Sequence, residues 1–261
     1  MNLSLHGKTA VVCGSSQGIG LACAKELAWL GANCILIARN AAALDHALSQ
    51  LHTSEQQNHL YAVADFSDIE SVRMAINEIV SQFPIHILIN NTGGPAAGLI
   101  SEAGEKAFTE AFNQHLICNH ILTQAVIPAM KAAEYGRIIN IVSTSIKIPI
   151  NNLGVSNTIR GAVASWAKTM ANELGQFNIT VNNILPGLTL TQRLESLIGN
   201  TSAKKKISRD MVVSDMLDEI PMKRFGDAAE IAALAAFIAS PAASYVNGTS
   251  IPVDGGKTGS I

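Results

Sequence analysis

The stretch Cys13-Gly14-Ser15-Ser16-Gln17-Gly18-Ile19-Gly20 directly follows a short apolar run at residues 9–13 and opens an amphipathic segment at residues 19–30. Glycines placed after a strand permit a tight turn and let the backbone approach a pyrophosphate closely. The first turn of the helix beyond offers unpaired N–H groups and the positive end of the helix dipole. The glycines could alternatively be turn residues only, but their place between a strand and a helix favours a dinucleotide-binding turn.

The rest of the chain repeats this alternation of short apolar runs and amphipathic segments. Apolar runs without period-two alternation are typical of parallel strands that are covered on both faces. The predicted strands are residues 9–13, 34–38, 60–64, 85–89, 138–142, 180–185 and 250–253, and the predicted helical segments include residues 19–30, 41–51, 68–82, 106–133 and 155–174. This order predicts an α/β fold, with one Rossmann-like domain over residues 1–261 and a doubly wound parallel sheet of about seven strands between two layers of helices. The polar segment 189–223 interrupts the pattern and is expected to form a lid-like insertion.

The composition excludes several classes of protein. With 261 residues, of which 48% are hydrophobic and 15% charged, the chain is long enough to bury a large core. A net charge of −2 gives no electrostatic reason to expect nucleic acid or an anionic membrane as a partner. The four cysteines form no CxxC pair, so we expect buried free thiols in a reducing compartment, and no metal site is predicted. The N-terminus lacks the pattern of a secretory signal, and the apolar run at residues 231–239 is shorter than the roughly 20 residues that cross a bilayer, so we expect a cytoplasmic protein.

Beyond the glycine-rich turn, further motifs occur in the order and spacing of the short-chain dehydrogenase/reductase family, which the chain resembles over nearly its whole length. The turn itself is similar to the family's TGxxxGIG, with cysteine in place of threonine. The other motifs each follow a predicted strand: Asp65-Phe66, Asn90-Asn91-Thr92-Gly93, Ser143, Pro186-Gly187 with Thr191, and Val253-Asp254-Gly255-Gly256. The last motif resembles that of the members that look like 3-oxoacyl-carrier-protein reductases.

The resemblance implies a catalytic set of asparagine, serine, tyrosine and lysine, of which this chain keeps only the serine, Ser143. Counting back from Thr123-Gln124-Ala125 puts His115 at the asparagine position. Thirteen residues after Ser143, Ser156 stands at the tyrosine position, and Arg160 stands at the lysine position. The flanking residues match the family helix, so a shift of register does not explain the change.

The altered set changes the acid–base chemistry. A serine hydroxyl is a poor acid, arginine stays protonated, and none of the chain's three tyrosines is placed to replace the missing phenol. Ser143 can still donate a hydrogen bond to a substrate carbonyl, and Arg160 can hold the nicotinamide ribose or bind a substrate carboxylate or phosphate. His115, or a water molecule near it, is the candidate proton donor, and the alternative is a core histidine bonded to a backbone carbonyl. Ser156 is either a space-saving residue or one that holds a water molecule.

The resemblance also implies a cofactor site. Its residues would be Gly14, Ser16, Gln17, Gly18, Ile19, Gly20, Arg39, Asp65, Phe66, Asn91, Gly93, Arg160, Pro186, Gly187 and Thr191. Enzymes that use NAD commonly place a carboxylate at the end of the second strand, and here that end reads Ile37-Ala38-Arg39-Asn40. A guanidinium at this point suits a 2′-phosphate and favours NADP(H) over NAD(H), and the alternative is a solvated arginine at the strand end. Gln17 weakens the argument, because many NADP-dependent members have a basic residue there.

Two hypotheses for the function follow. The first is an NADP-dependent oxidoreductase acting on a small carbonyl or alcohol substrate, with a 3-oxoacyl compound among the candidates, and the second is a non-catalytic NADP-binding sensor or structural subunit. In the first, Lys204-Lys205-Lys206 and Arg209 would attract an acyl carrier protein or acyl-coenzyme A, although a run of charges is also typical of a solvated helix face. By resemblance, helical segments 106–133 and 155–174 would form the interfaces of a homodimer or homotetramer.

Overall fold

Seven parallel strands form the main sheet in the computed structural model, which describes residues 1–54 and 56–260. The strand order β3-β2-β1-β4-β5-β6-β9 confirms the predicted doubly wound sheet, because the chain builds outward from β1 to β3 and then continues on the other side of β1 with β4. The strands are β1 (Thr9–Cys13), β2 (Asn33–Ala38), β3 (Leu60–Val63), β4 (Ile87–Asn90), β5 (Gly136–Ile141), β6 (Ile179–Pro186) and β9 (Ser250–Val253). A separate parallel pair joins β7 (Thr189–Leu190) to β8 (Gly226–Asp227).

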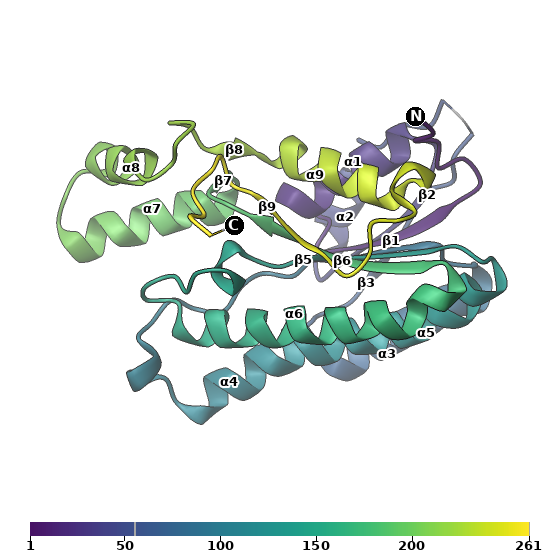
Figure 1. The fold of residues 1–261 in the computed structure, drawn as a ribbon, viewed down its shortest axis with the longest axis horizontal. Coiled ribbons are helices and arrows are strands. Elements are labelled where there is room, and N and C mark those ends of the chain that lie inside the picture. Colours follow the sequence, from purple (N-terminus) through teal and green to yellow (C-terminus); the bar gives the residue numbers. More distant parts are fainter. Residues whose placement is uncertain (55, 261) are drawn as a thin grey trace.

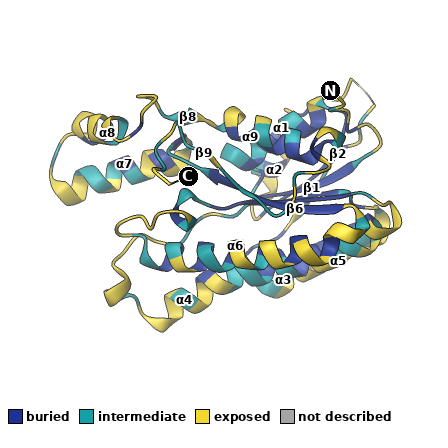
Figure 2. Cartoon of the chain, in the orientation of Figure 1, coloured by how far each residue is buried: buried dark blue, intermediate teal, exposed yellow. Residues whose placement is uncertain are grey.

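Helices cover both faces of the sheet, as Figure 1 shows. One face carries α1 (Gly18–Trp29), α2 (Ala41–Leu48) and α9 (Ala228–Ala239), and the other carries α3 (Ile69–Gln82), α5 (Cys118–Ala132) and α6 (Gly154–Leu174). Alternate residues of β1 enter different cores: Ala10 and Val12 pack on the α1 and α9 side, and Val11 and Cys13 on the α3 and α5 side. Because both faces of the central strands are covered, these strands are mostly apolar and buried, and Figure 2 shows them between helices whose outer surfaces are exposed.

Side-chain caps fix where several helices begin. Asn40 accepts a hydrogen bond from Ala43 N at the start of α2, and Asp68 accepts one from Glu70 N at the start of α3. Asp227 and Glu230 form a capping box at the start of α9. Short 3₁₀ turns occupy Ile100–Glu102, Thr144–Ile146, Gly175–Phe177 and Pro241–Ala243.

The helix expected over residues 106–133 is interrupted. It consists of α4 (Glu105–Phe112) and α5, joined by a π-helical turn over Asn113–Ile117. His115 is buried within this turn. Since single π-helical turns inside helices occur frequently at functional sites, the interruption directs attention to the residues around it.

A chain of buried amides crosses four neighbouring strands. Asn90 on β4 donates to Asn140 on β5 at 2.9 Å, Asn140 donates to Asn183 on β6 at 2.9 Å, and Asn183 donates to Ser250 on β9 at 3.0 Å. These residues are direct partners in the strand register. This row of hydrogen bonds therefore links neighbouring strands and fixes the alignment of β4 and β5, which are followed by Asn91 and Ser143.

The segment predicted as an insertion, residues 189–223, contains β7, α7 (Gln192–Lys205) and α8 (Arg209–Asp218). The two helices share a small apolar cluster of Leu194, Ile198 and Val212. Figure 1 shows them to one side of the layered sheet, beyond the N-terminal end of α9. Their role as a lid stays a prediction.

Two expectations from the composition can be compared with the structure. Within the described residues, no helix combines the length and apolar character that a bilayer-crossing segment needs. All four cysteines are buried and unpaired, as expected for free thiols. Burial raises the pKa of the Cys118 thiol to about 11, so this thiol is protonated near neutral pH.

Candidate active site

A cleft of about 670 Å³ lies at the carboxyl ends of the parallel strands. Its walls are formed by segments at the carboxyl ends of β1 to β6, together with α6 and the beginning of α7. The strand order reverses between β1 and β4, and doubly wound sheets bind ligands at this point. Of the fifteen predicted cofactor residues all but Gly20 line the cleft, namely Gly14, Ser16, Gln17, Gly18, Ile19, Arg39, Asp65, Phe66, Asn91, Gly93, Arg160, Pro186, Gly187 and Thr191.

The glycine-rich turn is held by Asn91. Its Nδ2 donates to the carbonyl oxygens of Cys13 and Gly14 at 3.2 and 3.3 Å. Gly14 has a φ of 59°, and a Cβ added there would lie 2.6 Å from Asn91 O, so this position requires glycine. A Cβ on Gly20 would lie 2.3 Å from Gly14 O. Gly20 therefore permits α1 to pack on the turn and does not itself line the cleft, and its expected part in the cofactor site stays a prediction.

The end of the cleft next to β2 and β3 carries Arg39, Asp65 and Phe66. The Asp65 carboxylate accepts hydrogen bonds from Ser67 N at 2.9 Å and Ser67 Oγ at 2.8 Å. These bonds, and to a smaller extent the charge of Arg39, hold the pKa of Asp65 below its usual value. Arg39 is exposed and forms no ion pair with any acidic side chain in the described part of the chain. Its guanidinium is therefore available to an anionic ligand.

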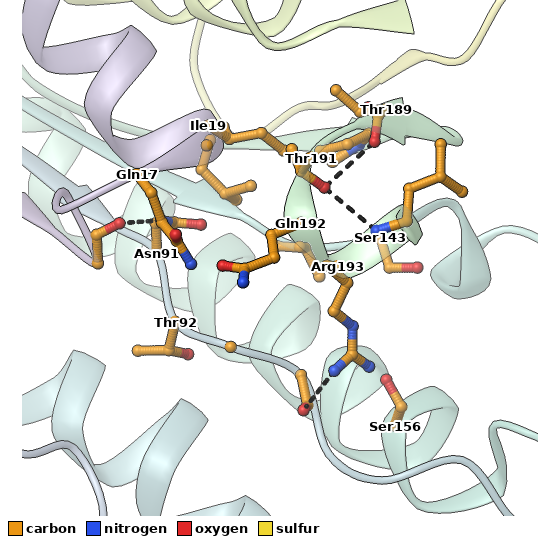
Figure 3. Close-up of a pocket in the computed structure, with 18 of the residues that line it drawn as sticks. Gln17, Ile19, Asn91, Thr92, Ser143, Ser156, Thr189, Thr191, Gln192 and Arg193 are labelled. Atoms are coloured by element: carbon orange, nitrogen blue, oxygen red, sulfur yellow. Dashed lines mark hydrogen bonds between the residues drawn. The ribbon is translucent and has the colours of Figure 1, made fainter. Parts of the chain in front are cut away.

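The opposite end of the cleft brings Ser143, Ser156 and Arg160 together. Ser156 and Arg160 are one turn apart on α6 and so lie on the same face of that helix. Ser143 Oγ accepts a hydrogen bond from Ser145 N at 3.1 Å, which fixes its position and leaves its proton available to a ligand. Figure 3 shows Ser143 and Ser156 at this end of the cleft. No tyrosine is among the described residues that line it, so no phenol replaces the missing one.

Arg160 is a buried cation. Its Nη1 donates to Ile141 O at 2.9 Å, while its buried Nε has no hydrogen-bond partner among the described residues. Burial, and secondarily the charge of Arg193, lowers the pKa of Arg160 to about 10, so it remains protonated near neutral pH. The structure therefore places a fixed positive charge where the family has lysine.

His115 lies behind the cleft wall, and its neighbour Gln114 lines the cleft instead. Its Nδ1 is 2.6 Å from Thr92 Oγ1, and its Nε2 has no partner among the described residues. Burial lowers the pKa of His115 to about 3, with smaller contributions from the charges of Arg160 and Arg193. The expectation that this histidine has a pKa suited to donating a proton near neutral pH is therefore wrong: the imidazole is neutral there and is held as a core group.

Arg193 belongs to no motif of the sequence, and it extends from the first turn of α7 into the cleft. Its Nη1 donates to Gly94 O at 3.2 Å and its Nη2 to Pro95 O at 3.1 Å. Thr191 fixes the helix start, because its Oγ1 accepts a bond from Leu194 N and donates to Thr189 O. Figure 3 shows the Arg193 side chain directed toward the part of the cleft that holds Ser156.

This arrangement can be compared with known proteins. A family model described as "Enoyl-(Acyl carrier protein) reductase" matches residues 14–258. The chain belongs to the short-chain dehydrogenase/reductase family. This confirms the predicted family and, with it, that the protein is an oxidoreductase of the short-chain class.

Individual members of the short-chain family match the chain over nearly its full length. An NADPH-dependent reductase, BacG, from Bacillus subtilis is 34% identical over 97% of this chain and 99% of the relative. The 3-oxoacyl-[acyl-carrier-protein] reductase FabG from Pseudomonas aeruginosa is 33% identical over 97% of this chain and 98% of the relative. The crystal structure of L-sorbose reductase from Gluconobacter frateurii, complexed with NADPH and L-sorbose, has a TM-score of 0.93, 30% identity and complete coverage of both chains.

The lysines predicted to attract an acidic partner of this short-chain reductase do not line the cleft. Lys204 and Lys205 form the last turn of α7, and Lys206 ends the helix with a φ of 55°. Lys205 pairs with Asp215 at 4.0 Å, and Arg209 pairs with Glu195. Cations at a helix C-terminus also interact favourably with the helix dipole, so this geometry fits a solvated helix end, and recognition of an acyl carrier stays a prediction.

Proposed function

We propose that this protein catalyses the NADPH-dependent reduction of a carbonyl group on a small molecule, or the reverse oxidation of the alcohol. The observation that carries the proposal is one cleft with the glycine-rich turn and Arg39 at one end and Ser143 and Arg160 at the other. The Bacillus relative, named as an NADPH-dependent reductase, supports the cofactor and the class of reaction.

The residues present fit a dinucleotide with a 2′-phosphate. Helix α1 has no side-chain cap at its N-terminus, so its first N–H groups are available to a pyrophosphate. Gly14 and Gly18 leave the approach to these groups free of side chains, and both have the positive φ that favours glycine. Arg39 would hold the 2′-phosphate, and Asp65 and Phe66 would lie beside the adenine. When bound, the nicotinamide supplies or accepts the hydride.

At the reacting end, Ser143 and Arg160 would act on the carbonyl oxygen. Ser143 Oγ would donate its proton to that oxygen, because it accepts a bond from Ser145 N and its own proton is not used by that bond. The fixed charge of Arg160 would stabilise the negative charge that develops on the oxygen, and burial strengthens such an interaction. The two groups together account for polarisation of the substrate.

The proton for the developing alkoxide would come from water. Serine is a poor acid, Arg160 remains protonated, and His115 is neutral near pH 7, so none of these side chains is a ready donor. Ser156 is smaller than the tyrosine it replaces, and its hydroxyl can hold a water molecule beside Arg160. We therefore propose a water molecule at Ser156 as the proton source.

Several finer points belong to the same proposal. The FabG-like relative makes a 3-oxoacyl compound one candidate substrate, while a non-catalytic NADP-binding sensor or subunit is the alternative function. Cytoplasmic location, a lid formed by α7 and α8, and a homodimer or homotetramer through α4, α5 and α6 remain predictions. The lid and the oligomeric state can be tested with the purified protein.

The test measures cofactor binding and turnover on the same sample. NADPH binding would be followed by titration calorimetry, and NADPH consumption by absorbance with ketoses, 3-oxoacyl thioesters, oxo acids and unsaturated acids. The proposal predicts NADPH binding and consumption with at least one carbonyl compound. Binding without consumption would favour the non-catalytic alternative, and absence of binding would exclude both.

A further inference from the structure

Two guanidinium groups meet at the reacting end of the cleft. A Cβ built on Gly94 would lie 3.1 Å from Arg193 Nη2 and 3.7 Å from Arg160 Nη2. The two arginines come from different elements, α6 and α7, and approach the same point of the loop after β4. Gly94 lacks a side chain, so the space between the two groups remains open to a ligand.

No acidic side chain in the described part of the chain, residues 1–54 and 56–260, is paired with either guanidinium group. Asp65 is the one acidic residue among the described cleft-lining residues, and it lies at the opposite end of the cleft. The hydrogen bonds of Arg160 and Arg193 go to backbone carbonyls, which carry no net charge.

Close like charges disfavour each other, and the effect is strong where one of them is buried. Arg160 is buried and its Nε is without a hydrogen-bond partner among the described residues, so its charge is incompletely compensated by hydrogen bonds. Arg193 is exposed to the cleft and can turn toward a ligand. An anion between the two guanidinium groups would relieve their repulsion and satisfy their donors.

We propose that Arg160 and Arg193 together bind a carboxylate of the substrate, so that the substrate is a small oxo acid or the corresponding hydroxy acid. The guanidinium fork matches the two oxygens of a carboxylate. The cofactor's phosphates have other partners, the α1 N-terminus and Arg39, which leaves this pair of arginines for the substrate. The inference rests on the proposed oxidoreductase function and names its substrate class.

The pairing also explains how the carbonyl would be oriented. Ser143, Ser156 and Arg160 line the same end of the cleft as Arg193. A carboxylate held between the arginines would place a neighbouring carbonyl within the region of the Ser143 hydroxyl. Substrates that lack the carboxylate would lose both the affinity and this orientation.

The experiment compares charged and neutral forms of the same compounds. The full-length protein, saturated with NADP⁺ so that no hydride can be transferred to the carbonyl, would be titrated by calorimetry with pyruvate, levulinate and benzoylformate, and with the methyl ester of each. We expect at least one acid to bind about 10- to 100-fold more tightly than its ester, as a lost charge-assisted contact implies. Arg193→Gln should abolish that difference, and Arg193→Lys should keep part of it.

Arg209→Gln provides the matched control, because it removes an arginine of the same segment that does not line the cleft. A wild-type affinity for NADPH in Arg193→Gln would show that the variant is folded. The proposal is overturned if no acid binds more tightly than its ester, or if Arg193→Gln leaves the ratio unchanged. Inorganic phosphate binding in place of the acids would also overturn it, in favour of a phosphorylated substrate. Failure to bind NADPH at all would instead contradict the proposed function.

Discussion

Replacing His115 by asparagine should make the protein less sensitive to acid. The folded protein holds the pKa of His115 at about 3, whereas an unfolded histidine titrates near 6.5. A pKa that is lowered on folding contributes stability that is fully present above about pH 6.5 and is lost as the pH falls toward about pH 3. Over that window the unfolded state binds a proton at this residue and the folded state does not.

The magnitude follows from the width of the window. Each pH unit corresponds to about 1.4 kcal/mol, so acidification from about pH 7.5 to about pH 5 should remove about 2 kcal/mol through His115 alone. Burial of the imidazole is the main cause of the low pKa of His115. Its Nε2 has no partner among the described residues that would favour protonation. The unfolded state of the Asn variant has no proton to bind at this position.

The assay is urea unfolding of the wild type and His115→Asn at both pH values. The variant should lose about 2 kcal/mol less on acidification than the wild type, whatever its starting stability, since the loss of the Thr92 contact affects both pH values. His6→Asn, at an exposed position, is the comparison for the general effect of removing a histidine. Equal losses in wild type and His115→Asn would refute a buried, neutral His115 and would restore it as a candidate proton donor.

Three further predictions concern the cofactor, the reacting groups and the sheet. Arg39→Ala should weaken NADPH binding by about 1–3 kcal/mol and leave NADH binding nearly unchanged, because only NADPH carries the 2′-phosphate that Arg39 would hold. Fluorescence titration would measure both affinities, and equal affinities of the wild type for the two cofactors would contradict this prediction. Ser156→Tyr with Arg160→Lys should raise carbonyl reduction above the wild-type rate in a steady-state assay, whereas neither single change should raise it, because phenol and ammonium act as a unit. A double variant that binds NADPH but stays at or below the wild-type rate would show that the cleft has diverged further. Asn140→Leu should lower the free energy of unfolding by about 2–4 kcal/mol, because it leaves Asn90 Nδ2 and Asn183 Oδ1 buried without these hydrogen-bond partners. A loss under about 1 kcal/mol in urea unfolding would show that the row of amides contributes little.

The sheet could be predicted because its signals are local. Each predicted strand overlaps an observed one, since a run such as residues 9–13 is apolar on both faces and bounded by turn residues. The helix over residues 106–133 was predicted as continuous, because the periodicity of its apolar residues survives a π-helical turn. The contact that accompanies the turn, between His115 and Thr92, joins residues far apart in sequence and has no local signature.

The candidate site was predictable where a motif carried it. The glycine-rich turn, Asn91 and Ser143 line the cleft as expected, since their spacing relative to the strands fixes their place at the sheet edge. Arg193 was missed because it lies in a segment with no readable motif and reaches the cleft only through the start of α7. The protonation state of His115 could not be predicted either, because its pKa depends on burial, which only the fold determines.

Isotope transfer tests the central claim most directly. The protein would be mixed with NADPH deuterated at the transferring position of its nicotinamide ring and with the oxo acid that binds most tightly, and the product would be examined by mass spectrometry. A reductase with its reacting end at Ser143 predicts one deuterium in the hydroxy acid product and a rate about 10²–10³-fold lower in Ser143→Ala. NADPH that binds but gives no deuterium to any carbonyl compound, or a Ser143→Ala variant as fast as the wild type, would contradict it.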